Sequence, residues 1–196
     1  MDGTNKHLIP FKMKHLLFAF GLSIFMISPT FAQKKKEVEI QKTDYRPLVK
    51  SLETTLGTLY LSLSGDKKEK RDWDLFKFLF KEDAKLITTG VDYEGKLQAK
   101  YMSPAEYVKA SKSWMLKNGF HEKEINRIVH TYGDITQVFS TFEAYHSSED
   151  KEPFMKGINS IQLLFDGNRW WIINLLWTNE TEDKPIPAEF LQKDDY

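Results

Sequence analysis

The chain of 196 residues contains no cysteine. This absence excludes disulfides, a thiolate nucleophile, a cysteine-linked lipid anchor and any metal site with sulfur ligands. The chain also lacks an excess of one charge, with 28 basic and 28 acidic residues. Without a strong field of one sign, we expect neither nucleic acid nor an anionic membrane surface as a main partner. The fold must therefore be stabilised by packing.

The sequence has no apolar run of the roughly 20 residues that a membrane-spanning helix needs. Its longest run, residues 16–27, follows three lysines and precedes a small-residue segment that ends at Ala32. This is the pattern of a secretory signal, so we expect cleavage after Ala32 and a secreted or periplasmic mature chain. Met13 begins a more compact signal and is an alternative start. Without residues 1–32 the chain keeps 25 basic and 27 acidic residues, a net charge of −2.

The remaining sequence predicts one domain. A polar linker at residues 33–43 precedes the domain at residues 44–180, and a polar, proline-broken tail follows at residues 181–196. Aromatic residues make up 14% of the chain. This share suits either a thick core or the lining of a cavity, and composition does not distinguish the two.

Helical patterns come first along this domain. Apolar residues recur at helical spacing over residues 45–63, which predicts one long helix, and a shorter pattern covers residues 72–81. Between them, residues 64–71 form a charged loop. Ser103, Pro104 and Glu106 have the spacing of a capping box with proline at the first helical position, so a third helix begins there and ends before Gly119.

Strand patterns dominate the second half. Short strands at residues 84–89 and 97–101 predict a small hairpin, and four longer candidates follow at residues 122–132, 135–145, 154–165 and 169–177. The last two strands flank a turn at residues 166–168 and are apolar on both faces. Within them Trp170 and Trp171 must point to opposite sides of the sheet, so we expect one indole in a cavity and the other on an outer face.

Helices, a short hairpin, a helix and then a long antiparallel meander predict an α+β fold with the helices on one side of a curved sheet. The segments RDWDLFKFLFKEDAKLI (71–87), YGDITQVFSTFEAY (132–145) and GINSIQLLFDGNRWWIINLLW (157–177) resemble the nuclear transport factor 2-like superfamily, especially its secreted or SnoaL-like members. The resemblance implies a cone-shaped, cystatin-like half-barrel wrapped around three helices, with a pocket inside. Such proteins commonly dimerise through the outer face. They include isomerases, dehydratases, polyketide cyclases and catalytically silent binding proteins.

Polar residues among large apolar ones are the candidate ligand contacts. A carboxamide in such surroundings needs a hydrogen-bonding partner, which is either the protein itself or a ligand. Tryptophans at these spacings fill the core or line the mouth of the pocket. The candidate ligand-binding residues are Trp73, Trp114, Gln137, Ser140, Asn159, Asn174 and Trp177.

Acid–base chemistry would need a titratable group in the pocket. His130 lies well inside a predicted strand and shares its parity with Tyr132, so it is a candidate base, and Asp83 is a second one. Tyr132 and Tyr101 are candidate polarising hydroxyls. Each residue also has a purely structural interpretation. The Asp–His and Tyr–Asp constellations of the enzymes in the superfamily do not map onto this sequence.

Three functional hypotheses remain open. The first is a secreted or periplasmic domain that binds a small apolar or amphipathic molecule, as a homodimer and without cofactor or metal. The second is a cofactor-free lyase or isomerase that acts on a small hydrophobic substrate. The third is a catalytically silent dimerisation domain, which would have a filled cone.

Overall fold

The computed structural model describes residues 43–191, which hold one domain. The predicted signal peptide lies outside the described residues. The helices are η1 (Arg46–Val49), α1 (Leu52–Leu63), α2 (Trp73–Phe78), α3 (Pro104–Asn118) and η2 (Ala188–Phe190). The strands are β1 (Phe80–Val91), β2 (Leu97–Met102), β3 (His121–Tyr132), β4 (Ile135–Tyr145), β5 (Met155–Phe165) and β6 (Trp170–Asn179). No helix among the described residues is long and apolar enough to cross a membrane.

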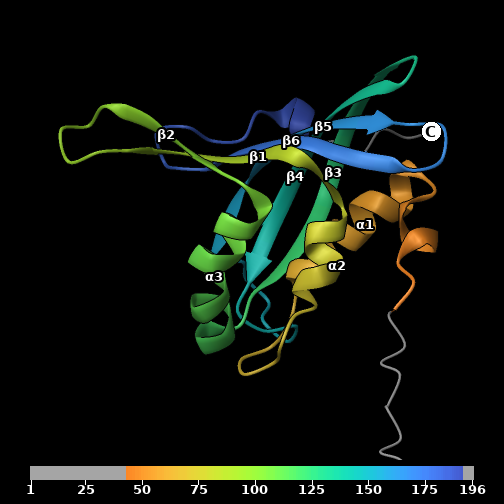
Figure 1. Cartoon of the computed structure of the whole chain (residues 1–196). Helices are drawn as coiled ribbons and strands as arrows, with labels where there is room; N and C mark the ends of the chain where they lie inside the picture. Colours follow the sequence, from red (N-terminus) through yellow and green to blue (C-terminus); the bar gives the residue numbers. More distant parts are fainter. Residues whose placement is uncertain (1–42, 192–196) are drawn as a thin grey trace, which may run out of the picture. The chain divides into compact units, whose positions relative to one another are not determined.

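The six strands form one curved sheet in the order β2-β1-β6-β5-β4-β3. Helices α1, α2 and α3 lie together against one face of this sheet, which is called the inner face below (Figure 1). The predicted α+β class is thereby confirmed. The sheet is not wholly antiparallel, because β1 and β6 run parallel to each other.

The third helix starts and ends where the sequence predicts. The Ser103 hydroxyl accepts a hydrogen bond from the Glu106 amide, and the Glu106 carboxylate accepts one from the Ser103 amide at 2.8 Å. This capping box fixes the first turn, with Pro104 at a position where no amide hydrogen is needed. The helix ends before Gly119, whose φ of +74° turns the chain directly into β3.

The single helix expected over residues 45–63 is wrong, because the structure divides it at Ser51. Ser51 has extended backbone angles and caps α1 with a reciprocal pair of hydrogen bonds to Thr54. A residue in that conformation cannot continue a preceding helix, so the earlier turn remains the separate η1.

The charged loop at residues 64–71 is anchored by a buried side chain. The Arg71 guanidinium donates hydrogen bonds to the carbonyl oxygens of Leu63 at 3.1 Å, Glu69 at 2.9 Å and Phe120 at 3.2 Å. These bonds join the end of α1 to the beginning of β3. Arg71 is therefore a structural clamp and not a solvated loop residue.

A β-bulge divides β3 into two parts. Glu124 pairs with Phe142, whereas Asn126 pairs with Thr141, so Ile125 is an extra residue in the strand. Such a bulge shifts every following side chain to the other face. Before Ile125, the even-numbered residues of β3 therefore point toward the helices. After Ile125, the even-numbered residues lie on the outer face of the sheet.

A second bulge lies in β6. Gln162 pairs with Asn174 and Leu163 with Ile172, which leaves Ile173 as the extra residue. Trp170 and Ile172 therefore share the inner face, while Asn174 lies on the outer face. Simple alternation along the strand predicts that Asn174 shares a face with Trp170 and Ile172, and the bulge makes this prediction wrong.

The inner face and the helices enclose the core, and the C-terminal segment covers part of the outer face. The Phe190 carbonyl oxygen accepts hydrogen bonds from Asn126 Nδ2 at 3.0 Å and Thr141 Oγ1 at 2.6 Å. The rings of Phe190 and Phe139 meet with their centroids 5.6 Å apart. Helix η2 thus packs on the side of the sheet opposite α1, α2 and α3 (Figure 1).

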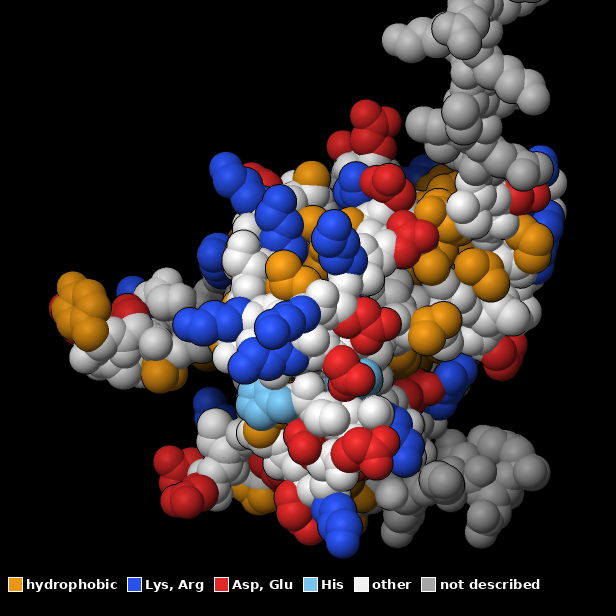
Figure 2. Space-filling view, turned by 90° about the horizontal axis from the view of Figure 1, so that it is seen from below, with side chains coloured by type: hydrophobic (Ala, Val, Ile, Leu, Met, Phe, Trp, Pro, Cys, Tyr) orange, Lys and Arg blue, Asp and Glu red, His pale blue; other side chains and the backbone are white. Residues whose placement is uncertain are grey.

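The hairpin of β1 and β2 extends beyond the body of the domain as an arm (Figures 1 and 2). Its strands pair from Leu86 with Met102 to Val91 with Leu97. Tyr93, in the turn, is 96% exposed. The small hairpin predicted from the sequence is confirmed, and its tip makes no contribution to the core.

Candidate ligand-binding cavity

A cavity of about 120 Å³ lies between the helices and the inner face of the sheet. Its walls come from α1, α2, α3 and every strand except β2. The lining residues are Leu59, Leu63, Phe76, Leu86, Tyr107, Met115, Phe120, Glu122, Phe142, Met155, Asn159, Leu175 and Trp177. Most of them are apolar. The presence of this cavity means that the cone is not filled by its own side chains.

The size and walls of the cavity suit a molecule built around a single ring. An apolar protein cavity of about 150 Å³ is large enough to hold benzene. Tyr107 is stacked on Phe76 with their ring centroids 5.4 Å apart, and it forms a T-shaped pair with Trp177 with centroids 5.9 Å apart. These aromatic pairs fix the wall in one arrangement, because each ring orients the next.

Glu122 is the titratable carboxyl of this cavity. Asn159 Nδ2 donates a hydrogen bond to Glu122 Oε1 at 2.9 Å. Burial raises the pKa of the Glu122 carboxyl to about 7, although the hydrogen bond from Asn159 opposes the shift. The Glu122 side chain is partly exposed, and it lines the cavity. None of the ion pairs within residues 43–191 includes Glu122.

A polar network leads away from Glu122 behind the cavity wall. Asn159 Nδ2 also donates to the Tyr60 hydroxyl at 3.2 Å, and this hydroxyl is 2.6 Å from Ser140 Oγ. The Ser140 hydroxyl donates to Glu124, which forms an ion pair with Arg127. The network holds the Asn159 carboxamide in place, with its nitrogen toward Glu122.

Tyr107 is a third polar residue that lines the cavity, together with Glu122 and Asn159. Burial raises the pKa of its phenol, and the negative charge of Glu122 raises it further. The phenol therefore stays protonated at any physiological pH and can donate a hydrogen bond. A carboxyl with a pKa near 7 can either accept or release a proton, so the cavity contains a potential acid–base group.

Two of the predicted ligand-binding residues, Asn159 and Trp177, line the cavity. Ser140 lies directly behind the wall, in the hydrogen-bond network. Trp73 packs against Phe76 with centroids 5.9 Å apart and belongs to the core. Trp114 is 46% exposed and contacts the rings of Phe120, His146 and Phe154.

The other two, Gln137 and Asn174, lie on the outer face. Gln137 Nε2 donates to Ser160 Oγ at 3.0 Å, and Asn174 Nδ2 donates to Gln162 Oε1 at 3.4 Å. Asn174 Oδ1 is buried without a hydrogen-bond partner among the described residues. Asn174 points away from the cavity because of the bulge at Ile173.

The four candidate catalytic residues all lie outside the cavity. The bulge at Ile125 turns His130 to the outer face, where it cannot act as a base in the cavity. Tyr132 is 86% exposed at the end of β3, and Tyr101 is 67% exposed on β2. Asp83 is exposed on β1.

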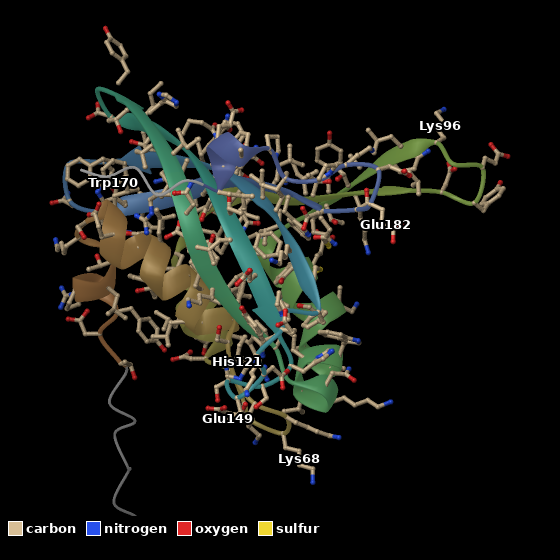
Figure 3. The ribbon with its side chains drawn as sticks, turned by 180° about the vertical axis from the view of Figure 1, so that it is seen from behind. Lys68, Lys96, His121, Glu149, Trp170 and Glu182 are labelled. Atoms are coloured by element: carbon tan, nitrogen blue, oxygen red, sulfur yellow. The ribbon has the colours of Figure 1, made fainter. Side chains whose placement is uncertain are left out.

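Figure 3 shows the β3 end that carries Glu122: the neighbouring His121 is at the opposite end of the domain from Trp170.

The sequence reasoning missed Glu122 and its neighbours. Glu122 and Glu124 share one parity in a strand rich in charged residues, which is the usual pattern of a solvated face. One signal that this side of the strand faces inward was present in the sequence: the apolar residue Phe120 shares the parity of Glu122, and it is buried. Tyr60 and Tyr107 were recognised only as members of apolar helix faces.

The two adjacent tryptophans lie on opposite faces of the sheet. Trp170 is on the inner side, where it packs on Phe165 and the core without lining the cavity. Trp171 lies outside, with the Arg169 guanidinium 3.5 Å above its ring, and its Nε1 donates to Asp166 at 2.6 Å. The cavity tryptophan is Trp177 and not one of this pair.

Residues 43–191 contain no group of three or more His, Asp or Glu side chains placed to hold a metal ion.

The sequence matches no protein-family model and no curated protein. Several solved structures are similar in fold. The beta subunit of a candidate aromatic-ring-hydroxylating dioxygenase from Novosphingobium aromaticivorans has a TM-score of 0.51 and 14% identity, covering 68% of this chain and 94% of that one. A candidate scytalone dehydratase from the same organism has a TM-score of 0.50 and 13% identity, covering 66% and 81%. A protein of unknown function from Mycobacterium tuberculosis has a TM-score of 0.50 and 12% identity, covering 69% and 75%.

These similarities establish the fold. The domain has the nuclear transport factor 2-like fold, as the resemblance in the sequence predicted. Because fold alone does not define chemistry, a function must be argued from the cavity.

Proposed function

We propose that this domain binds a small, mostly apolar molecule in the cavity, with a polar group of that molecule held by Glu122 and Asn159. One observation carries the proposal: an apolar cavity inside the cone contains a buried carboxyl that has no ionic partner among the described residues. Small-molecule sites typically combine apolar walls with a few convergent polar groups. The aromatic pairs and the network behind Asn159 support a wall that is formed before a ligand arrives.

Filling the cavity tests this proposal. Toluene and benzyl alcohol are single-ring probes, and each is expected to raise the melting temperature in proportion to its binding. Met155 lines the cavity from β5. Met155→Phe places a ring in the same space and is expected to weaken probe binding at least tenfold, measured by thermal shift and tryptophan fluorescence.

The matched control is Leu61→Phe, since Leu61 is 69% exposed on α1 and away from the cavity lining. It adds a ring of the same kind to the surface and should leave binding unchanged. Circular dichroism verifies that both variants fold. Equal probe binding by Met155→Phe and the wild type would disprove the proposed site.

A second candidate function is a cofactor-free lyase or isomerase with Glu122 as the proton-transfer group, in place of His130 or Asp83. The observation that favours it is the raised pKa of Glu122, about 7, in a cavity that also contains the Tyr107 phenol. Efficient general bases have a pKa near the working pH. The candidate scytalone dehydratase of similar fold supports the same class of reaction.

Proton exchange at carbon tests this second function. With small cyclic ketones in D₂O, NMR should show enzyme-dependent exchange beside the carbonyl, with kcat/KM rising as the pH increases through about 7 because the base must be ionised. Glu122→Gln should lower kcat at least 100-fold, whereas Glu82→Gln, a change at an exposed site on β1, should not. Undiminished exchange in Glu122→Gln would rule out this mechanism.

We also propose that the mature domain is exported to the periplasm or secreted, on the basis of the signal pattern in residues 1–32. A homodimer through the outer face stays a prediction. That face is already covered by η2 over part of β3 and β4, so a dimer would have to use the remainder. The purely structural dimerisation domain is the least favoured of the three hypotheses, because the cone contains a cavity.

A further inference from the structure

Two acceptor oxygens of the cavity have no donor among the described residues. Asn159 uses its amide nitrogen twice, toward Glu122 Oε1 and the Tyr60 hydroxyl. No described residue donates a hydrogen bond to Asn159 Oδ1 or to Glu122 Oε2. Neither oxygen is among the fully buried atoms that lack a partner, so both keep some accessible surface. A ligand that matches them must supply donors.

The charge of Glu122 is also unmatched. Glu124, two residues along and on the same side of β3, forms an ion pair with Arg127 and accepts a hydrogen bond from Ser140. Glu122 has a hydrogen bond from a neutral amide and no cationic partner among residues 43–191. A buried carboxylate without a counter-ion is costly, and a ligand that brings a positive charge removes this cost.

The walls around this carboxyl suit a cation. Phe76, Tyr107 and Trp177 form a continuous aromatic surface beside it. Aromatic faces attract cations electrostatically, most strongly where water is excluded. The same rings accommodate the apolar part of a ligand.

We propose that the ligand is a small primary amine, bound in its protonated form, that carries one ring or a branched apolar group of similar size. The ammonium group donates hydrogen bonds to Glu122 and Asn159, and the apolar group fills the space against Tyr107 and Trp177. This inference rests on the proposed binding function and specifies its ligand class. The cavity of about 120 Å³ limits the ligand to about the size of benzylamine.

Binding of a cation should be coupled to proton release. The pKa of Glu122 is about 7 in the free protein, so at pH 6 most protein molecules have a protonated Glu122. They must release this proton when an ammonium group binds. The titratable groups facing Glu122 are Tyr60 on α1, Tyr107 on α3 and Glu124 on β3, and burial holds the pKa values of both phenols well above their usual range. The strands β4 and β5 present only the neutral Ser140 and Asn159. Affinity for the amine should therefore rise about tenfold from pH 6 to pH 8.

Isothermal titration calorimetry with benzylamine, benzyl alcohol and benzoate tests the proposal. The three probes have similar size and carry a positive, a neutral and a negative group. We expect benzylamine to bind at least tenfold more tightly than benzyl alcohol at pH 8, and benzoate not to bind. Titrations at pH 6 in buffers of different ionisation enthalpy should show about one proton released per benzylamine bound.

Two variants separate the ligand class from the cavity itself. Glu122→Gln should bind benzylamine at least tenfold more weakly and without pH dependence, and it should lose far less affinity for benzyl alcohol; Glu82→Gln should behave as wild type. If benzyl alcohol binds as tightly as benzylamine, or if Glu122→Gln binds benzylamine unchanged, the amine proposal is wrong and the binding function stands. If no probe binds the folded protein, or Met155→Phe binds all of them normally, both proposals are wrong.

Discussion

Glu122→Gln is expected to raise the free energy of unfolding at pH 8 by about 3 kcal/mol and to leave it nearly unchanged at pH 4.5. Burial raises the pKa of Glu122 from 4.5 to about 7 in the folded protein. A raised pKa means that the protonated form is favoured by folding. The associated stability is fully present below the unfolded value and is lost as the pH rises through about 7. Glutamine stays neutral, so the variant keeps this stability. Urea unfolding followed by circular dichroism at several pH values measures the difference.

A control of opposite sign is available on β4. The hydrogen bond from Tyr145, and then that from Lys156, lower the pKa of Glu143. Its contribution is present above the unfolded pKa and is lost as the pH falls, so Glu143→Gln should be slightly less stable than the wild type at pH 8, by less than about 1 kcal/mol. A Glu122→Gln variant that shows no extra stability at pH 8 would mean that the wild-type carboxyl is solvated and not buried.

Gly119→Ala should destabilise the domain by about 3 kcal/mol or more, through a clash at the junction of α3 and β3. A Cβ atom at this position would lie 2.1 Å from the His146 carbonyl oxygen. The backbone of Gly119, with φ +74° and ψ 152°, is in a region that only glycine adopts readily. β3 begins two residues later, and both Phe120 and Glu122 at this junction line the cavity. A backbone shift that makes room for the methyl group should therefore also weaken probe binding.

The matched control is Gly57→Ala in the middle of α1. Gly57 is exposed, has no heavy atom within 4 Å of an added Cβ and is helical. Alanine there should stabilise the protein by about 0.5–1 kcal/mol. Thermal unfolding of both variants compares them directly. A Gly119→Ala variant as stable as the wild type would show that the junction can rearrange.

Local signals predicted most of the fold correctly. The capping box at Ser103, the turn at residues 166–168 and the alternation over residues 135–145 depend on neighbours within a few positions. The break at Ser51 escaped prediction because apolar spacing continues across it and only the backbone angles reveal the cap. Arg71 was assigned to a charged loop, and its burial could not be predicted because its carbonyl partners come from segments up to 49 residues away.

The site was less predictable than the fold because it depends on which way each strand faces. Asn159 lies on β5, where the side chains alternate without an extra residue, and Trp177 pairs with it on the inner face. His130 and Asn174 follow a one-residue shift that leaves no distinct mark in the sequence. Glu122 was overlooked because its burial arises from α1 and α3 packing over the strand, and a charged residue near a strand end normally faces water.

The extra residue Ile125 divides β3 into two stretches on which natural selection can act separately. Substitutions at Glu122, before it, change the cavity, and those after it on the same parity, at Ile128 and His130, change the outer surface. A lineage can therefore alter its ligand and its outer contacts independently along one strand. Deletion of Ile125 would remove this separation, because it would turn Ile128 and His130 to the inner face in a single genetic step.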